Sequence, residues 1–330
     1  MKVAIVKPDH VGDFVLSKPA IGALIRHFGD ITLFVGTPVF PLANAIFPGL
    51  NVRPMDLPHL SKSGTIAVTV DEARCQLLDF DLIVFLRDDK VIRQLASTLK
   101  ARLVYSGGDH LTHETLIQKR ALCNLIQYSR TELFSGEPIE WPRTVSTVGL
   151  CIGAGFPNNR WPHVYWIEIA QELAAGGVDI RIVGGQAERL DAELIRKYLG
   201  LPEEHVILGS SDFRAFWSAI DDVDVVLATD GGTAHLCSLR RPVLSIFASS
   251  PWRRYAPFGK YNRLLTRDLA CCPCVQFSSD EVNACVTREC ASWILPRDVL
   301  RVICTPCLSN MAQEIGRCVL WSGVSHLARN

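Results

Sequence analysis

Short apolar segments alternate with helix-like segments along almost all of this chain, and this alternation restricts the possible folds more than any other feature. Most of the apolar segments are hydrophobic on both faces, which is typical of parallel strands covered by helices on both sides. Strands and helices that alternate in this way build βαβ units and parallel sheets. We therefore predict an α/β protein. The expected strands are residues 3–6, 31–35, 82–86, 103–105, 148–152, 180–183, 206–208, 225–228 and 243–247.

The alternation is interrupted around residues 135–143, and this interruption divides the chain. The segment contains two prolines and a glycine, which favour a linker. A chain of 330 residues is also about twice the common domain size. We predict two tandem Rossmann-like domains, residues 1–143 and 144–303, and a helical tail at 304–330. Their parallel sheets are expected to face each other across a cleft, with ligand at the carboxyl ends of the strands.

The expected helices follow the strands in order. The first is predicted over residues 18–28, because Ser17 suits an N-cap, Pro19 suits a first helical turn and Gly29 follows the end. The others are expected at 165–175, 187–198, 213–221 and 233–239, and the tail is helical in pattern from Pro296.

Composition excludes several classes of protein. Hydrophobic residues make up 48% and charged residues 21%, which argues against a disordered chain. The 34 Lys and Arg residues balance 34 Asp and Glu residues, so the basic excess of a nucleic-acid binder is missing. The pattern of a signal peptide and the 18-residue apolar run of a spanning helix are missing too. We expect a cytoplasmic protein, at most peripheral to the inner membrane, whose twelve cysteines are mostly reduced.

The loop after the first expected strand carries a candidate catalytic acid, Asp13. It lies at the mouth of the predicted sheet beside a helix N-terminus, where a carboxylate can reach a ligand. Most aspartates at such positions are helix caps or first-turn acids, which is the alternative for Asp13. The charge run at 87–90 is interpreted, in contrast, as a solvated loop.

A glycine-containing loop with a cation follows the first strand of the second predicted domain. Gly153 and Gly155 allow the backbone to approach a ligand closely, and Arg160 supplies a permanent positive charge. This combination suits a phosphate or pyrophosphate, although a simple tight turn also accounts for the glycines. Trp161 and Trp166 are interpreted as packing residues rather than platforms for a sugar.

A further loop joins a strand end to a helix. It runs from Asp230 through Gly231, Gly232 and Thr233 to His235. Backbone amides at the helix start, assisted by the threonine hydroxyl, make a site for an anion. The alternative is that the aspartate and threonine cap the helix while the histidine packs within it. We favour a bound phosphate.

Cysteines gather in residues 271–290. Cys271, Cys274, Cys285 and Cys290 can provide four thiolates for a structural Zn²⁺ or iron. The second pair is more widely spaced than is common in such sites. The alternative is a set of reduced, partly buried cysteines in a loop-rich segment.

Four segments, 11–13, 153–162, 230–235 and 247–259, occur in an order and spacing that resembles a known family. This family is the ADP-heptose:lipopolysaccharide heptosyltransferases, glycosyltransferase family nine, which have the GT-B fold. The resemblance extends from residue 1 to about residue 303. It implies inverting transfer of a heptose from ADP-heptose to a hydroxyl of lipopolysaccharide core or of a related glycan or protein, with no cofactor required for catalysis.

The resemblance also implies roles for individual residues. Asp13 is implied as the general base, the first domain as the acceptor-binding part and the second as the nucleotide-sugar-binding part. The diphosphate is expected on the amides at the start of the helix after residue 230. The implied donor-binding residues are Gly153, Gly155, Asn159, Arg160, Asp230, Gly231, Gly232, Thr233 and His235.

Two positions depart from the usual family pattern. Asn159 stands where many members carry a lysine, so Arg160 is left as the cation or the donor contact is altered. Gly231 stands where a hydroxyl residue is common. Two other functions therefore stay open, a GT-B nucleotide-sugar epimerase and a non-catalytic nucleotide-sugar-binding homologue. Acceptor contacts are expected from the loops at 53–65 and 87–93, which do not identify the acceptor.

Overall fold

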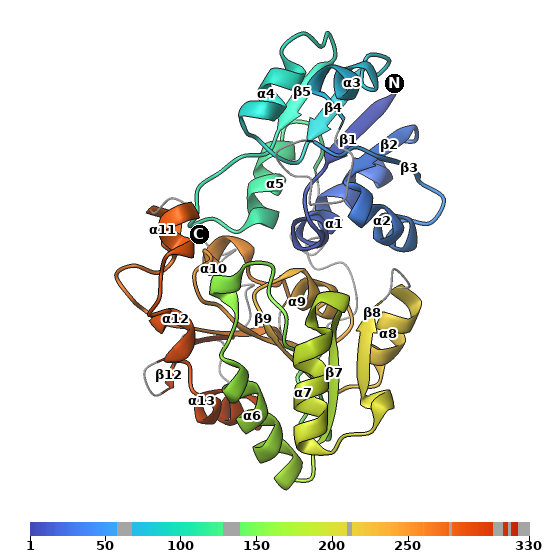
Figure 1. Ribbon diagram of the computed structural model, residues 1–330. Helices are drawn as coiled ribbons and strands as arrows, with labels where there is room; N and C mark the ends of the chain where they lie inside the picture. The colour runs from blue at the N-terminus through green and yellow to red at the C-terminus, as the bar shows by residue number, and fades with distance from the viewer. Residues whose placement is uncertain are drawn as a thin grey trace. The chain divides into compact units, whose positions relative to one another are not determined.

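The chain forms two compact units, Met1–Ser135 and Gly136–Asn330 (Figure 1). The structure is a computed structural model that describes residues 1–57, 68–127, 139–209, 213–259, 261–276, 279–305, 313–315 and 318–322. Both units are α/β, as predicted. Among the helices of these ranges, none is both long and apolar enough to cross a membrane.

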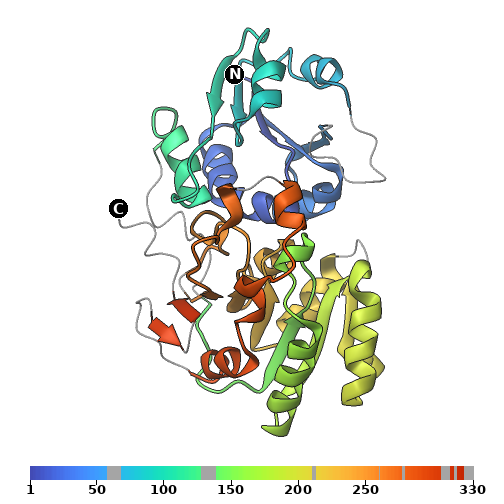
Figure 2. The same ribbon diagram turned by 60° about the vertical axis from the view of Figure 1, so that its left-hand side comes forward.

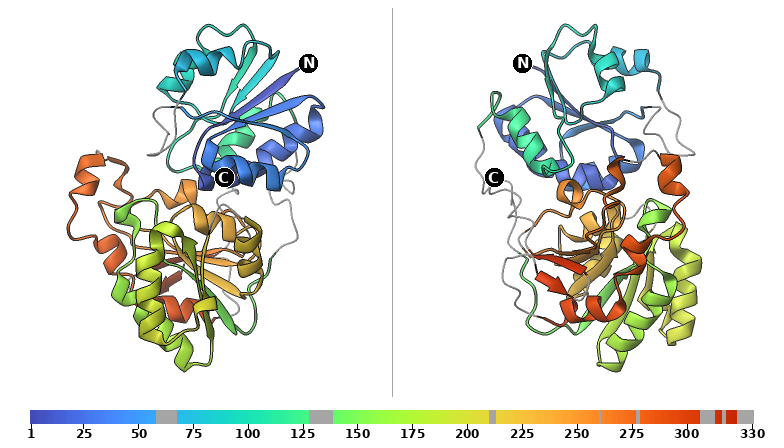
Figure 3. Two further views of the ribbon diagram at one scale, coloured as in Figure 1. Left: turned by 45° about the vertical axis from the view of Figure 1, so that its right-hand side comes forward. Right: turned by 90° about the vertical axis from the view of Figure 1, so that its left-hand side faces the viewer.

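The first unit contains a five-stranded parallel sheet. Its order is β3 (Asn51–Pro54), β2 (Ile31–Val35), β1 (Val3–Lys7), β4 (Leu82–Phe85) and β5 (Arg102–Tyr105). The three central strands are fully buried because helices cover both faces of the sheet (Figure 3). The helices are α1 (Val11–His27), α2 (Phe40–Ile46), α3 (Val70–Cys75), α4 (Lys90–Ala96) and α5 (Glu114–Leu122), with a 3-10 turn η1 (Thr37–Val39).

Helix α1 begins earlier than the sequence predicts. Ser17, the expected N-cap, is buried inside the helix and donates its hydroxyl proton to the backbone oxygen of Asp13 at 2.8 Å. Pro19 also lies inside α1. Burial of Phe14 and Leu16 favours helix through this region and outweighs the preference of Ser17 and Pro19 for a helix start. Asp13 is therefore in the first turn of a helix and not in a loop.

The second unit contains an eight-stranded sheet. Its order is β12 (Gln313–Ile315), β13 (Cys318–Ser322), β11 (Arg263–Thr266), β10 (Val243–Ile246), β9 (Val225–Thr229), β6 (Thr147–Cys151), β7 (Asp179–Gly185) and β8 (Val206–Gly209). The strands from β11 to β8 are parallel, and β6, β9 and β10 hold the centre. All the strands predicted in both units are confirmed, with bounds that agree within two residues.

Helices and 3-10 turns connect these strands. They are η3 (Pro157–Asn159), α6 (His163–Ala175), η4 (Gln186–Glu188), α7 (Arg189–Leu199), η5 (Glu203–His205), α8 (Phe213–Asp221), α9 (Gly232–Cys237), α10 (Trp252–Tyr255), η6 (Cys274–Gln276), α11 (Ser279–Asn283), α12 (Glu289–Ser292) and α13 (Pro296–Ile303). Trp141 anchors α13, because its indole nitrogen donates to the Ile303 oxygen at 3.4 Å and its ring stacks under Arg263. Trp141, which lies within the predicted linker, thus belongs to the core of the second unit.

The prediction of a helical tail at 304–330 is wrong for the part of the tail that the structure describes. Strands β12 and β13 form an antiparallel pair there, and β13 continues the sheet beside β11 (Figure 2). The segment Cys318–Ser322 is rich in apolar and aromatic residues that suit a strand. Pairing with the edge of β11 satisfies the backbone hydrogen-bonding groups of β13. A local sequence pattern does not reveal such a pairing.

Candidate functional site

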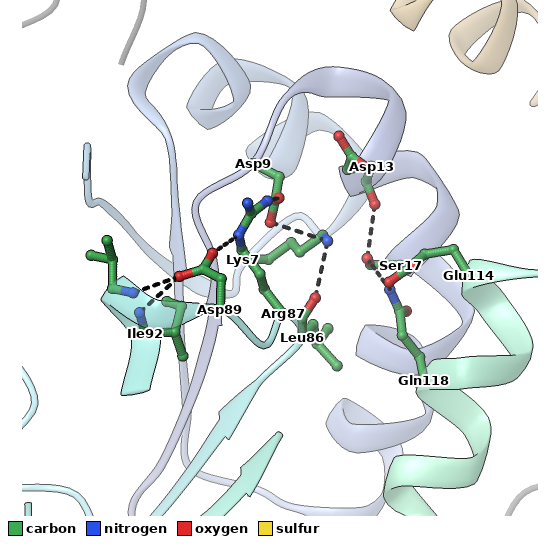
Figure 4. A network of polar contacts seen from close by, with 11 residues as sticks. Lys7, Asp9, Asp13, Ser17, Leu86, Arg87, Asp89, Ile92, Glu114 and Gln118 are labelled. Carbon is green, nitrogen blue, oxygen red and sulfur yellow. Dashed lines mark hydrogen bonds and ion pairs between the residues drawn. The ribbon is translucent and has the colours of Figure 1, made fainter. Parts of the chain in front are cut away.

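Asp13 lies in the first turn of α1, just beyond the carboxyl end of β1 (Figure 4). Its side chain is half-buried. The turn is held by α5, because the Gln118 amide donates to the Ser17 hydroxyl at 2.8 Å and to the Glu114 carboxylate at 3.1 Å. Ser17 in turn donates to the backbone of Asp13. The position of the predicted acid is therefore fixed by two packed helices.

A charged network surrounds the end of β1 (Figure 4). The buried Lys7 ammonium donates to the Leu86 oxygen at 3.0 Å and pairs with the buried Asp9 carboxylate at 3.1 Å. Arg87 pairs with Asp9 and also with Asp89. Asp89 accepts hydrogen bonds from the first amides of α4 and so caps that helix. These ion pairs join the ends of two neighbouring strands, β1 and β4.

The network separates the proton affinities of two carboxyls that are four residues apart. Burial raises the pKa of Asp13 to about 6; the Asp9 and Glu114 carboxylates add to this rise, while Lys7 and Arg87 oppose it. Burial acts in the same direction on Asp9, but Lys7 and Arg87 outweigh it and lower the pKa of Asp9. Asp13 can therefore exchange a proton near neutral pH while Asp9 stays ionised.

Sequence reasoning missed most of this network. Residues 87–90 were interpreted as a solvated loop, but Arg87 is partly buried against Asp9 and Asp89 is a helix cap. Lys7 and Glu114 carried no sequence signal of a role. One signal was present: charged residues follow two apolar strands, and such strand ends meet at one edge of a parallel sheet.

In the second unit, the structure brings the two glycine-containing loops together. The Thr229 hydroxyl at the end of β9 donates to the Gly153 oxygen at 2.5 Å. A Cβ placed on Gly231 would lie 3.7 Å from the Gly155 nitrogen, so the backbones of the two loops run close to each other. Helix α9 starts at Gly232, and the amides of its first turn have no acceptor within the helix.

Asn159 is buried, with 2% of its surface exposed, and its amide is hydrogen-bonded within the protein. Its Nδ2 donates to the Asp230 carboxylate at 3.0 Å and to the Ser250 hydroxyl at 2.7 Å. Its Oδ1 accepts from the Ser249 amide at 3.2 Å and from the Ser249 hydroxyl. Ser249 and Ser250, which follow β10, were not predicted as site residues.

The residues around Asn159 divide into solvent-facing and core positions. Arg160 is exposed, so its guanidinium is open to a ligand. Trp161 is buried, its indole nitrogen donates to the Ile294 oxygen at 2.8 Å, and its ring meets Trp166 edge-on. The interpretation of both tryptophans as packing residues is confirmed. His235 is buried in α9, whereas Thr233 is partly exposed at the start of that helix.

In the part of the chain that the structure describes, no group of three or more His, Cys, Asp or Glu side chains is arranged to hold a metal ion, and the four-thiolate site stays a prediction. Cys271 and Cys285 are exposed, whereas Cys290 is buried. The neighbouring Cys272 donates instead to the Ala248 oxygen at 2.8 Å. Cys272 also shares a hydrogen bond with the Cys290 thiol, and this bond lowers the pKa of Cys290 to about 7.

The sequence profile of glycosyltransferase family 9 (heptosyltransferase) matches residues 118–284, which is half of the chain. The chain belongs to glycosyltransferase family 9. The match includes the second-unit loops at 153–162 and 230–235, whereas Asp13 lies outside it.

Individual heptosyltransferases resemble this family 9 chain to different extents. Lipooligosaccharide heptosyltransferase 2 of Haemophilus ducreyi is 31% identical over 122 residues, which is 34% of this chain and 34% of that protein. The match therefore spans about a third of this relative's length. Lipooligosaccharide heptosyltransferase 2 of Campylobacter jejuni is 23% identical over 297 residues, which is 84% of this chain and 91% of that protein.

The fold of this family 9 chain is that of solved family relatives. The structure of the Escherichia coli ADP-heptose lps heptosyltransferase II aligns with a TM-score of 0.59 at 17% identity. The alignment covers 91% of this chain and 97% of that chain. The predicted α/β GT-B fold is thereby confirmed.

Proposed function

We propose that this chain transfers a heptose from ADP-heptose to a hydroxyl group of lipopolysaccharide core or of a related glycan or protein, with inversion at the anomeric carbon. Asp13 is the proposed general base. The observation that carries this role is a half-buried carboxyl whose pKa of about 6 lies close to the operating pH of a cell. A general base works best when its pKa is near that pH.

The proposed reaction is a single displacement. The acceptor hydroxyl gives its proton to a carboxylate oxygen of Asp13 as the acceptor oxygen bonds to the anomeric carbon. The bond from this carbon to the diphosphate oxygen breaks, and its electron pair leaves with ADP. The first unit holds the acceptor in this proposal and the second holds the donor.

The donor half of the proposal is supported by the loops of the second unit. Amides at the start of α9, from Gly231 to Thr233, have no partner in the helix and suit the oxygens of a diphosphate. Arg160 is exposed at the end of the neighbouring loop and adds a permanent positive charge. Preorganised donors of this kind stabilise the charge that develops on the leaving ADP.

The test compares the wild-type protein with Asp13→Asn, a nearly isosteric change. ADP release from ADP-heptose is measured with a lipopolysaccharide core acceptor, and ADP, UDP and GDP binding is measured by calorimetry. We expect turnover to fall by a factor of about 100 to 10,000, the range of general-base catalysis. Affinity for ADP is expected to stay within about twofold, because the base does not contact the nucleotide in this proposal.

Four outcomes would contradict the proposal. A variant that keeps near-normal turnover removes Asp13 as the base. Tighter binding of UDP or GDP overturns the donor. Conversion of the nucleotide sugar without any acceptor indicates an epimerase, and ADP binding without turnover on any lipopolysaccharide, glycan or protein acceptor indicates a non-catalytic homologue.

A further inference from the structure

The Asn159 side chain has no hydrogen-bonding capacity left for a ligand. A primary amide offers two N–H donors and an oxygen with two lone pairs. Both donors are used, on Asp230 and Ser250, and both lone pairs accept from Ser249. With 2% of the residue exposed, a ligand can reach this amide only by breaking bonds that already satisfy it.

These four bonds connect three loops that leave neighbouring strands of one sheet. Asn159 ends the η3 turn after β6, Asp230 follows β9, and Ser249 and Ser250 follow β10. β6, β9 and β10 are adjacent in the sheet, so their carboxyl ends open on the same edge. One amide therefore sets the relative positions of the loops at that edge.

The third loop is also held from its other side. The Cys272 thiol donates to the Ala248 oxygen at 2.8 Å, and the Cys274 amide donates to the Ser249 oxygen at 2.8 Å. Ser249 thus presents its hydroxyl and amide to Asn159 and its carbonyl to the cysteine segment. Because this third loop is held on two sides, it cannot shift independently of Asn159. The position of the Asn159 amide therefore also fixes Ser250 and Asp230.

We propose that Asn159 is a positioning residue for the donor site: it orients the Asp230 carboxylate and the Ser250 hydroxyl toward the nucleotide sugar and makes no contact with that ligand itself. This assignment rests on the proposed function, since it takes the loops of the second unit as the donor site. It replaces the direct donor contact that the sequence predicts for Asn159. The remaining cation for the diphosphate is then the adjacent, exposed Arg160.

The test uses Asn159→Asp and the matched control Asn158→Asp. Asn158 is the preceding residue and is also buried, but its amide donates to the Val282 oxygen and not to a carboxylate. Only the first variant places a second carboxylate 3.0 Å from an oxygen of Asp230. Two carboxylates so close cannot both ionise without strong repulsion, and the pair takes up a proton at higher pH than either alone.

We expect Asn159→Asp to bind ADP about 10- to 100-fold more weakly than wild type at pH 8, since the repulsion moves Asp230. At pH 5.5 a proton shared by the two carboxyl groups takes the place of the lost amide hydrogen. The ADP affinity of the variant is then expected to lie within about threefold of wild type. Comparison with wild type at each pH cancels the titration of ADP itself. Asn158→Asp also buries a carboxylate but places it beside no second carboxylate, so its ADP affinity relative to wild type is expected to change less between the two pH values.

Ser249→Ala gives a milder second variant if Asn159→Asp does not fold. It removes one bond to Oδ1 and leaves the backbone bond, so ADP binding is expected to weaken by about threefold to tenfold. Two results would overturn the positioning role alone. One is an ADP affinity of Asn159→Asp that bears the same ratio to wild type at both pH values. The other is an ADP affinity of Ser249→Ala within twofold of wild type. A wild-type protein that does not bind ADP would overturn the donor site, and the positioning role with it.

Discussion

Replacement of Asp13 by asparagine is expected to stabilise the protein at neutral pH while it removes the proposed base. The folded protein raises the pKa of this carboxyl from an ordinary 3.8 to about 6, chiefly through burial. The folded state therefore binds the Asp13 proton more tightly than the unfolded chain does. Ionisation at neutral pH works against folding, and an asparagine does not ionise.

The size of the effect follows from the shift in pKa. The rise is about 2 units, and each unit corresponds to about 1.4 kcal/mol, so the free energy of unfolding loses up to about 3 kcal/mol at neutral pH. The sign is set by the raised pKa: the loss is absent below pH 3.8, grows as the pH rises and is complete above 6. We expect Asp13→Asn to melt about 4 to 10 °C higher than wild type at pH 8.

The assay is thermal unfolding at pH 4.5 and pH 8, with Asp9→Asn as the control of opposite sign. Lys7 and Arg87 lower the pKa of Asp9, so its stabilisation is present at neutral pH and is lost in acid. Its replacement leaves two partly or fully buried cations without this carboxylate, at a cost of about 3 to 5 kcal/mol. A raised pKa of Asp13 in the folded protein is refuted if Asp13→Asn gains no stability at pH 8, or if its gain does not grow between the two pH values.

Three further predictions concern the site and its support. Glu114→Gln removes a carboxylate that raises the pKa of Asp13, so the acid limb of the pH–turnover profile is expected to move down by about half a unit; an unmoved limb would argue against this coupling. Arg160→Ala is expected to raise the KM for ADP-heptose about tenfold with an unchanged melting temperature, and an unaltered KM would exclude the arginine from the donor site. Trp161→Phe leaves the Ile294 oxygen without its indole donor and is expected to cost about 1 to 3 kcal/mol in denaturant unfolding, with ADP affinity as the readout that stays constant.

The strands were predictable where burial on both faces makes a run of apolar residues. The central strands β1, β4, β6, β9 and β10 are such runs, and their bounds follow closely from the sequence. The strands that were missed lie toward the sheet edges or are polar. β3 is largely exposed, and β13 forms because β11 offers an unpaired edge. Such pairings depend on a distant segment of the chain, and local hydrophobic periodicity carries no information about that segment.

The site shows the same division. Asp13, Asp230 and the glycine loops were identifiable, because residues that follow buried parallel strands gather at one edge of a sheet. The partners of Asn159 were not, since Ser249 and Ser250 are about 90 positions away and no pattern links them. From sequence alone, an asparagine can be interpreted as a ligand-binding residue or as a loop residue. The structure decides, because it shows whether hydrogen bonds within the protein already satisfy the amide.

The sequence by itself determined the α/β class, the division into two units, the positions of the central strands along the chain and an acid placed after the first of them. These properties depend on hydrophobic periodicity and on turn residues, which are local. Only the tertiary structure decided that Asp9 stays ionised while Asp13 binds a proton near neutral pH, and that the Asn159 amide is saturated by hydrogen bonds within the protein. Proton affinity and hydrogen-bond saturation depend on burial and on charges brought from distant strands, so neither can be read from the residues alone.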